Sequence, residues 1–132
     1  MAVPPPAPVA LVVDDEPEVV ALVCDILAEL GFKALTATTE TILEIAATHS
    51  PEVVLLDIMM PGIDGYSLAI RLRRDPRTAS IPIVFLTGAT SPIYRTLSAG
   101  LGAVAHVQKP FTLATFRAAL SRALGRPLTD PG

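Results

Sequence analysis

Three acidic residues stand directly after short apolar runs, at the points where buried strands would end. Asp14 and Asp15 follow the run Leu11–Val13, and Asp57 follows the run Val53–Leu56. In an open parallel α/β sheet, ligands bind beyond the carboxyl ends of the strands, which share one edge. The spacing therefore predicts that three carboxylates meet at one edge of a sheet.

Two further apolar runs end in residues of different chemistry. Residues 81–86 precede Thr87, and residues 104–108 precede Lys109 and Pro110. Clustered carboxylates need a cation, because two like charges ~4 Å apart repel by roughly 4 kcal/mol at an effective dielectric near 20. Mg²⁺ suits carboxylate, water and phosphate oxygens, and Lys109, one of two lysines in the chain, is the other candidate. An acid cluster with one amine and one hydroxyl suits phosphoryl chemistry.

Most of these residues have a simpler interpretation when each is considered alone. The pair Asp14 and Asp15 can cap a helix. Thr87 alone is typical of a turn, and Lys109 alone of a solvated strand end. Asp57 is harder to explain in this way, because an acid without a role after four apolar residues would be costly to desolvate. The complete set, placed at four strand ends, favours a functional site.

Length and composition limit the class of protein. The chain has 132 residues, enough for one domain, and its 51% hydrophobic content supplies a core. A net charge of −3 argues against direct nucleic-acid binding. No apolar run approaches the roughly 18 residues of a spanning helix, so we expect no membrane insertion. The lone Cys24 has no partner for a disulfide, which fits a reducing interior and predicts a cytoplasmic protein.

The ends of the chain differ in composition from its middle. Residues 1–8 are proline-rich and lack a positively charged start, which predicts a disordered tail rather than a signal peptide. Residues 126–132 indicate a short tail or the start of a linker. Residues 9–125 are predicted to form the folded domain.

The apolar runs alternate with segments of helical spacing, which predicts a parallel sheet covered by helices on both faces. A weaker fifth strand is expected at Lys33–Ala37. Gly62 and Gly65 would permit a tight loop after Asp57, and Asp64 would cap the helix that follows. The predicted helices run from Pro17 to a stop at Gly31, over Thr39–His49 and Gly65–Asp75, from Pro92 to about residue 101, and from Thr112 to a stop at Gly125.

The order of these motifs resembles the receiver domain of bacterial two-component response regulators. The resemblance extends from about Val9 to Leu124 and includes the segment 57–65, which reads Asp-Ile-Met-Met-Pro-Gly-Ile-Asp-Gly. It implies a flavodoxin-like (βα)5 fold: a doubly wound, five-stranded parallel sheet with strand order 2-1-3-4-5. It also implies that the bond between Lys109 and Pro110 is cis.

The resemblance further implies the chemistry of the site. Asp57 would be the phosphoacceptor, taking a phosphoryl group from a histidine kinase or a phosphotransfer protein. Mg²⁺ would be held by Asp14, Asp15, the Asp57 carboxylate and the backbone carbonyl of Met59. Such a domain takes part in its own phosphoryl transfer without being a conventional enzyme.

Two more residues carry implied roles, and one position departs from the family. Lys109 would pair with a phosphoryl oxygen, and the Thr87 hydroxyl would move inward to another. His106 stands where the family usually has Tyr or Phe, whose ring reports the state of the threonine. We expect His106 either to act as a switch or to be an exposed strand histidine without that role.

The output is expected to be a downstream protein target, bound by the face of the predicted helix 92–101, strand 104–108 and the helix from Thr112. A homodimer through this face is one hypothesis, because it is rich in apolar residues. These are Tyr94, Ala99, Leu101, Ala103 and Ala105.

Three other functions fit the sequence less well. A Mg²⁺-dependent phosphatase could use Asp57 as its nucleophile, but Met59 cannot serve as the nearby general acid. A degenerate receiver would act as a phosphorylation-independent interaction module, which the intact site set disfavours. A nucleotide-binding Rossmann domain is disfavoured because residues 14–17 contain no glycine-rich phosphate loop.

Overall fold

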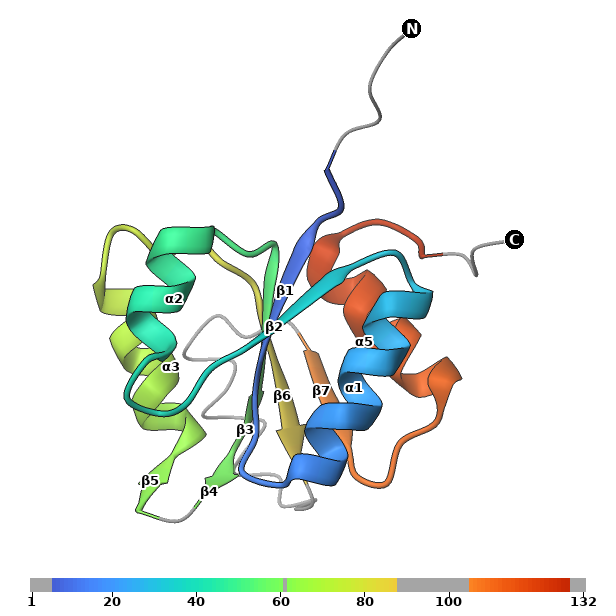
Figure 1. Ribbon diagram of the computed structural model, residues 1–132, viewed down its shortest axis with the longest axis horizontal. Coiled ribbons are helices and arrows are strands. Elements are labelled where there is room, and N and C mark those ends of the chain that lie inside the picture. Colours follow the sequence, from blue (N-terminus) through green and yellow to red (C-terminus); the bar gives the residue numbers. More distant parts are fainter. Residues whose placement is uncertain (1–5, 61, 88–104, 129–132) are drawn as a thin grey trace, which may run out of the picture.

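The computed structural model describes residues 6–60, 62–87 and 105–128. A five-stranded parallel sheet lies between two layers of helices, α1 and α5 on one face and α2 and α3 on the other (Figure 1). The strands are β1 (Val9–Val13), β2 (Lys33–Thr36), β3 (Val53–Asp57), β4 (Met59–Met60), β5 (Ile63–Asp64), β6 (Ile83–Thr87) and β7 (Ala105–Gln108). The helices are α1 (Pro17–Glu29), α2 (Ile42–His49), α3 (Gly65–Arg74) and α5 (Leu113–Leu124).

The strand order of the main sheet is β2-β1-β3-β6-β7. This is the predicted order 2-1-3-4-5, because β6 and β7 are the fourth and fifth long strands of the chain. The doubly wound α/β fold is therefore confirmed. The short antiparallel pair of β4 and β5 was not predicted. The predicted helix over residues 92–101 lies outside the described residues.

The sheet separates two apolar cores. One lies under α1 and α5 and includes Val12, Leu55 and Phe116. The other lies under α2 and α3 and includes Leu56 and Phe85. Successive strand residues point to opposite faces, so a strand covered on both sides is apolar throughout. All five residues of β3 are buried for this reason, including the aspartate at its end.

Local chemistry sets the ends of the helices. Pro17 occupies the first turn of α1. Asp64 caps α3 by accepting a hydrogen bond from the Ser67 N–H at 2.8 Å, as predicted. Thr112 forms a reciprocal capping box with Thr115 at the start of α5.

The predicted start of the second helix at Thr39 is wrong by three residues. The side-chain hydroxyl of Thr38 accepts from the Thr41 N–H, and that of Thr41 accepts from the Thr38 N–H. Threonine side chains that bond the local backbone in this way compete with helical hydrogen bonds. The helix therefore begins at Ile42, after the turn.

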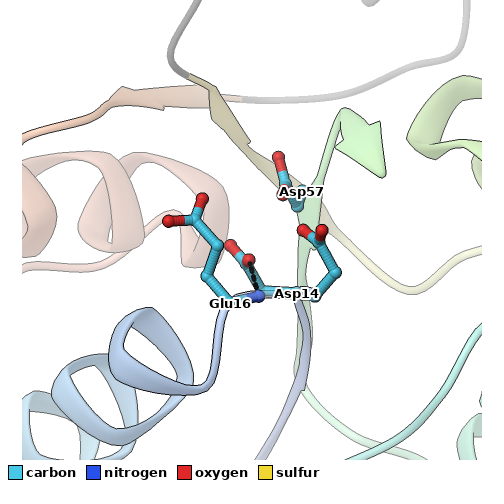
Figure 2. A group of neighbouring side chains, drawn as sticks. Asp14, Glu16 and Asp57 are labelled. Carbon is cyan, nitrogen blue, oxygen red and sulfur yellow. Dashed lines mark hydrogen bonds between the residues drawn. The ribbon is translucent and has the colours of Figure 1, made fainter. Parts of the chain in front are cut away.

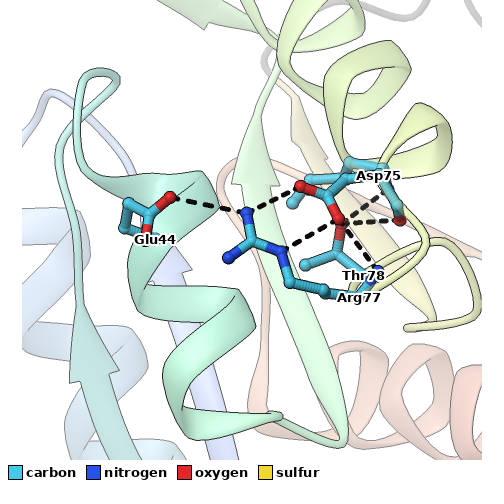
Figure 3. A network of polar contacts seen from close by, with 5 residues as sticks. Glu44, Asp75, Arg77 and Thr78 are labelled. Carbon is cyan, nitrogen blue, oxygen red and sulfur yellow. Dashed lines mark hydrogen bonds and ion pairs between the residues drawn. The ribbon is translucent and has the colours of Figure 1, made fainter.

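A polar network connects the segment that follows α3 to α2 (Figure 3). The Arg77 guanidinium contacts Asp75 Oδ2 at 2.8 Å and reaches Glu44 of α2 at 3.4 Å. Beneath it, the buried Thr78 hydroxyl donates to the carbonyl of Leu72 in the last turn of α3, at 2.6 Å. The hydroxyl thus donates a hydrogen bond to a carbonyl that the end of a helix would leave without a partner. In the described part of the chain, no helix has the length and apolar character needed to cross a membrane.

Candidate functional site

The acidic residues meet at the carboxyl edge of the sheet. β1 and β3 are neighbours in register, with Val13 beside Leu56. Asp14 and Asp15 follow β1, and Asp57 is the last residue of β3. Carboxylate oxygens from Asp14, Asp15, Glu16 and Asp57 lie within 4.8 Å of one another, and Figure 2 shows three of these side chains converging. The predicted meeting of three carboxylates is thus present, with Glu16 as a fourth.

Asp57 is held in place by backbone on both sides. Asp57 is only 2% exposed, and its Oδ1 accepts a hydrogen bond from the Met59 N–H at 3.1 Å. The start of α3 contacts the backbone beside Asp57, because the Gly65 N–H donates to the Ile58 carbonyl at 2.7 Å. A Cβ atom on Gly65 would collide with the Asp57 carbonyl oxygen. Glycine is therefore required for this close approach.

Lys109 brings an ammonium group into the acid cluster. It directly follows β7, and the bond from it to Pro110 is cis, as predicted. Its Nζ lies 2.8 Å from Asp14 Oδ2, 3.1 Å from Glu16 Oε1 and 3.3 Å from Asp57 Oδ2. The Lys109 side chain is 15% exposed, so three carboxylates share one partly buried cation.

Burial and charge shift the acid–base properties of this pair. Burial, and then the neighbouring charge of Asp14, raise the pKa of Asp57 to about 6, although Lys109 opposes the shift. Burial alone would lower the pKa of Lys109. Hydrogen bonds to Asp14 and Glu16 outweigh that effect and raise the Lys109 pKa above its usual value. At pH 7, Asp57 is therefore ionised and Lys109 is protonated. The site holds more carboxylates than ammonium groups.

The donor set fits a hard divalent cation. Apart from their ion pairs with Lys109, the buried Oδ2 atoms of Asp14 and Asp57 have no hydrogen-bond partner among the described residues. Oxygens of this kind are preferred ligands of Mg²⁺, which also retains several waters. A pocket of about 330 Å³ adjoins the cluster and offers room for them. It is lined by Val13, Asp14, Asp15, Ala37, Thr38, Thr39 and Met60.

Two other predicted site residues, Thr87 and Met59, lie at the ends of strands. Thr87 ends β6, paired in register with Gln108, and its side chain lies outside the described part of the structure. The Met59 residue begins β4. Asp14 does not cap α1 with its side chain, because Glu16 holds the cap position; instead Asp14 Oδ1 accepts from the Glu16 N–H at 2.9 Å.

His106 lies in a stack of rings. Its imidazole is half-buried and packs on Phe85, with ring centroids 5.8 Å apart. Phe85 in turn packs on Tyr66 of α3 at 5.0 Å. The alternative of an exposed strand histidine is therefore wrong, because the ring packs on the neighbouring strand. Its role as a switch stays a prediction.

The proposed apolar partner surface needs one correction. Ala105 is 5% exposed and belongs to the core under α1 and α5. Alternation along β7 sends Ala105 and Val107 to that core and His106 to the other side. The remaining residues of that surface, Tyr94, Ala99, Leu101 and Ala103, lie outside the described ranges.

Glu16 is the site residue that the sequence interpretation did not include. From the sequence alone, Glu16 is explained as a negative charge at the positive end of the first helix. The run Asp14-Asp15-Glu16 before Pro17 was the available signal. Its contact with Lys109 joins residues 93 positions apart, which a local pattern does not reveal.

Comparison with known proteins identifies the family. The family model described as "Response regulator receiver domain" matches residues 10–121. The chain belongs to this family, whose members are signalling domains of response regulators.

Several curated proteins are similar to the chain. The phosphate regulon transcriptional regulatory protein PhoB of Pseudomonas aeruginosa is 34% identical over 123 residues, which are 92% of this chain and 53% of that protein. A probable cyclic di-GMP phosphodiesterase of Vibrio cholerae is 37% identical over 103 residues, which are 78% of this chain and 23% of that protein. The chain therefore spans between about a quarter and a half of the length of these relatives.

Solved structures agree in fold. The chemotaxis protein CheY4 of Vibrio cholerae has a TM-score of 0.84 at 28% identity, covering 89% of this chain and 99% of that one. The BeF3-activated N-terminal receiver domain of RstA from Klebsiella pneumoniae has a TM-score of 0.78 at 32% identity, covering 88% and 97%. A receiver fold thus accounts for nearly all of the described chain.

Proposed function

We propose that this chain is a phospho-accepting signal receiver in which Asp57 takes the phosphoryl group. The supporting observation is the state of its carboxylate: buried at the end of β3, 3.3 Å from the Lys109 ammonium and beside the acids that follow β1. A buried acid in that position is costly unless it serves a cation or a reaction. The donor is a phosphohistidine on a histidine kinase or a phosphotransfer protein.

The transfer needs no base to activate the nucleophile. An oxygen of Asp57 forms a bond to phosphorus while the N–P bond of the phosphohistidine breaks, and the bonding electron pair remains on the imidazole nitrogen. Lys109 pairs with one oxygen of the transferred group as a point charge. The Thr87 hydroxyl binds another oxygen and moves inward when phosphate is present.

The acid cluster would also hold Mg²⁺ under this proposal. Asp14, Asp15, the Asp57 carboxylate and the Met59 carbonyl would be the ligands. A bound Mg²⁺ would neutralise charge that develops on the transferring group. Among the described residues, the buried Oδ2 atoms of Asp14 and Asp57 have no partner apart from the Lys109 ammonium, which supports this assignment.

Phosphorylation changes the surface that a downstream protein binds. We place this surface on residues 92–101, β7 and α5, with His106 as the ring that responds to Thr87. A phosphate ligand shifts such an equilibrium only if it binds the two conformations with different affinity. A phosphorylation-promoted homodimer through the same surface is part of the proposal. Sedimentation that finds a monomer both with and without a phosphoryl mimic would exclude the dimer.

The deciding experiment is incubation with Mg²⁺ and a small phosphodonor, followed by intact mass measurement. The wild type and an Asp25→Asn control, which changes an exposed acid of α1, should each gain one phosphoryl adduct. Asp57→Asn should gain none. Absence of an adduct in the wild type would favour a phosphorylation-independent interaction module. Catalytic turnover of the phosphodonor without an adduct would favour a phosphatase.

A further inference from the structure

Glu16 contacts Lys109 from a backbone position that is fixed on both sides. Its N–H donates to Asp14 Oδ1 at 2.9 Å, and its carbonyl accepts from the Val19 and Val20 N–H groups at 3.0 and 3.1 Å. The Glu16 side chain makes no capping bond to α1. Instead its Oε1 accepts a hydrogen bond from Lys109 Nζ at 3.1 Å. The Glu16 carboxylate thus contacts the side chain of the residue that follows the edge strand β7.

The three carboxylates around Lys109 differ in burial. The side chains of Asp14 and Asp57 are 0% and 3% exposed, whereas that of Glu16 is 59% exposed. A divalent cation at the cluster would bind the same Oδ2 atoms that face Lys109 in the structure. The cation would also repel the ammonium, because like charges a few ångströms apart repel even at the effective dielectric of a protein surface. Glu16 is then the carboxylate that remains with Lys109.

We propose that Glu16 is a positioning residue, which keeps the Lys109 ammonium beside Asp57 when a divalent cation occupies Asp14 and Asp57. The inference rests on the proposed function, since it concerns the same site in its cation-bound state. Lysine has a long stem with many rotamers, and an untethered ammonium would spread over the solvent side of the site. With Glu16 in place, the Lys109 ammonium stays within reach of an incoming phosphoryl group.

The position of Lys109 can be observed directly, because the chain contains two lysines. Protein labelled with ¹³C at the lysine ε-carbon gives two NMR signals, and the exposed Lys33 serves as the internal reference. In the wild type at saturating Mg²⁺, Lys109 should keep two inequivalent ε-protons, as expected for a held side chain. In Glu16→Gln with Mg²⁺, its signal should average and approach that of Lys33. Without Mg²⁺, both proteins should show a held Lys109.

A kinetic measurement tests whether the position of the Lys109 ammonium affects the rate of phosphorylation. At saturating Mg²⁺ and phosphodonor, Glu16→Gln should slow adduct formation about threefold or more, and the effect should vanish in a Lys109→Met background, as expected for residues that act as a pair. Glu18→Gln, which removes an exposed charge from the first turn of α1, should react as the wild type does. Glu16→Asp, which keeps the charge but shortens the reach, should restore only part of the rate.

The outcomes separate this inference from the function on which it rests. If the wild type binds Mg²⁺ and is phosphorylated while Lys109 is held equally well in Glu16→Gln, the positioning role is wrong and the receiver function stands. The same conclusion follows if the rate loss persists unchanged in the Lys109→Met background, since Glu16 would then act without Lys109. If calorimetry detects no Mg²⁺ binding by the wild type, both proposals fail.

Discussion

Gly65 lies so close to the carbonyl oxygen of Asp57 that no Cβ atom fits between them. The first residue of α3 is therefore in contact with the backbone of the proposed phosphoacceptor. The Gly65 N–H bond to the Ile58 carbonyl fastens the same junction. The start of α3 and the backbone of Asp57 are thus in direct contact.

Replacement of Gly65 by Ala should therefore impair both stability and phosphorylation. We expect Gly65→Ala to lower the free energy of unfolding by about 2 kcal/mol or more, because the added methyl group forces the backbone apart. Urea denaturation measures this loss, and the rate of adduct formation should fall with it.

Gly62→Ala is the matched control for that substitution. Gly62 has a φ of +82°, and a Cβ there meets no atom within 4 Å. The cost should be the conformational one alone, about 1 kcal/mol. Equal losses for the two variants would contradict the steric explanation for Gly65.

The acid cluster is expected to lower stability at neutral pH. The pKa of Asp57 is raised to about 6, above its value in the unfolded chain. The resulting stabilisation is present at low pH and is lost as the pH rises through 6. Asp57→Asn should therefore raise the free energy of unfolding at about pH 7.5, by roughly 1–3 kcal/mol, and change it less at about pH 5.

Urea denaturation without Mg²⁺ at the two pH values measures this effect. Asp25→Asn, at an exposed position of α1, should change stability by less than about 0.5 kcal/mol at both. Addition of Mg²⁺ should then stabilise the wild type, since a ligand that binds only the folded state stabilises it. A wild type that is more stable than Asp57→Asn at the higher pH would contradict the cost assigned to this carboxylate.

Much of the fold and part of the site could be predicted from the sequence, because burial leaves a local signal. β3 is covered on both faces, so it reads as a continuous apolar run whose end marks Asp57. The helix ends at Pro17, Asp64 and Thr112 follow from backbone groups that need local partners. Parallel strands then bring Asp14, Asp15 and Asp57 to one edge with no further information.

The remainder depends on contacts that local patterns do not encode. The strands β4 and β5 have two residues each, too few for a period of two to be recognised. Ala105 was expected at the surface, although it faces the core under α5. The bond from Glu16 to Lys109 joins segments that follow β1 and β7, which are not neighbours in the sheet. Such features result from tertiary packing, whereas the later start of α2 results from the local hydrogen bonds between Thr38 and Thr41.

Thr78 contributes to the stability of the fold at a position away from the site, and this contribution can be tested. Its hydroxyl is buried and donates to the Leu72 carbonyl at 2.6 Å. Thr78→Val keeps the shape but leaves that carbonyl without the hydroxyl, so we expect a loss of about 1–3 kcal/mol in the free energy of unfolding. Thr78→Ser keeps the hydroxyl and should lose less. Phosphorylation should be unchanged in both variants, and a Ser variant as unstable as the Val variant would assign the effect to packing.

The role of His106 can be tested with the two histidines of the chain. His106 packs on Phe85, whereas His49 is exposed at the end of α2 and serves as the reference. If the His106 ring responds to the site, addition of Mg²⁺ and beryllofluoride, a phosphoryl mimic, should shift its NMR signals in the wild type. The shift should be absent in Asp57→Asn, because a ligand without a binding site cannot alter the population of conformations.

Substitution then asks whether the ring transmits a signal. His106→Tyr restores the residue type usual in the family and should preserve a difference between the free and beryllofluoride-bound proteins. His106→Ala removes the contact with Phe85 and should reduce that difference, measured as amide shift changes in α5. Identical changes in the wild type and both variants would show that the imidazole only fills space beside Phe85, and that the surface responds to Asp57 by another route.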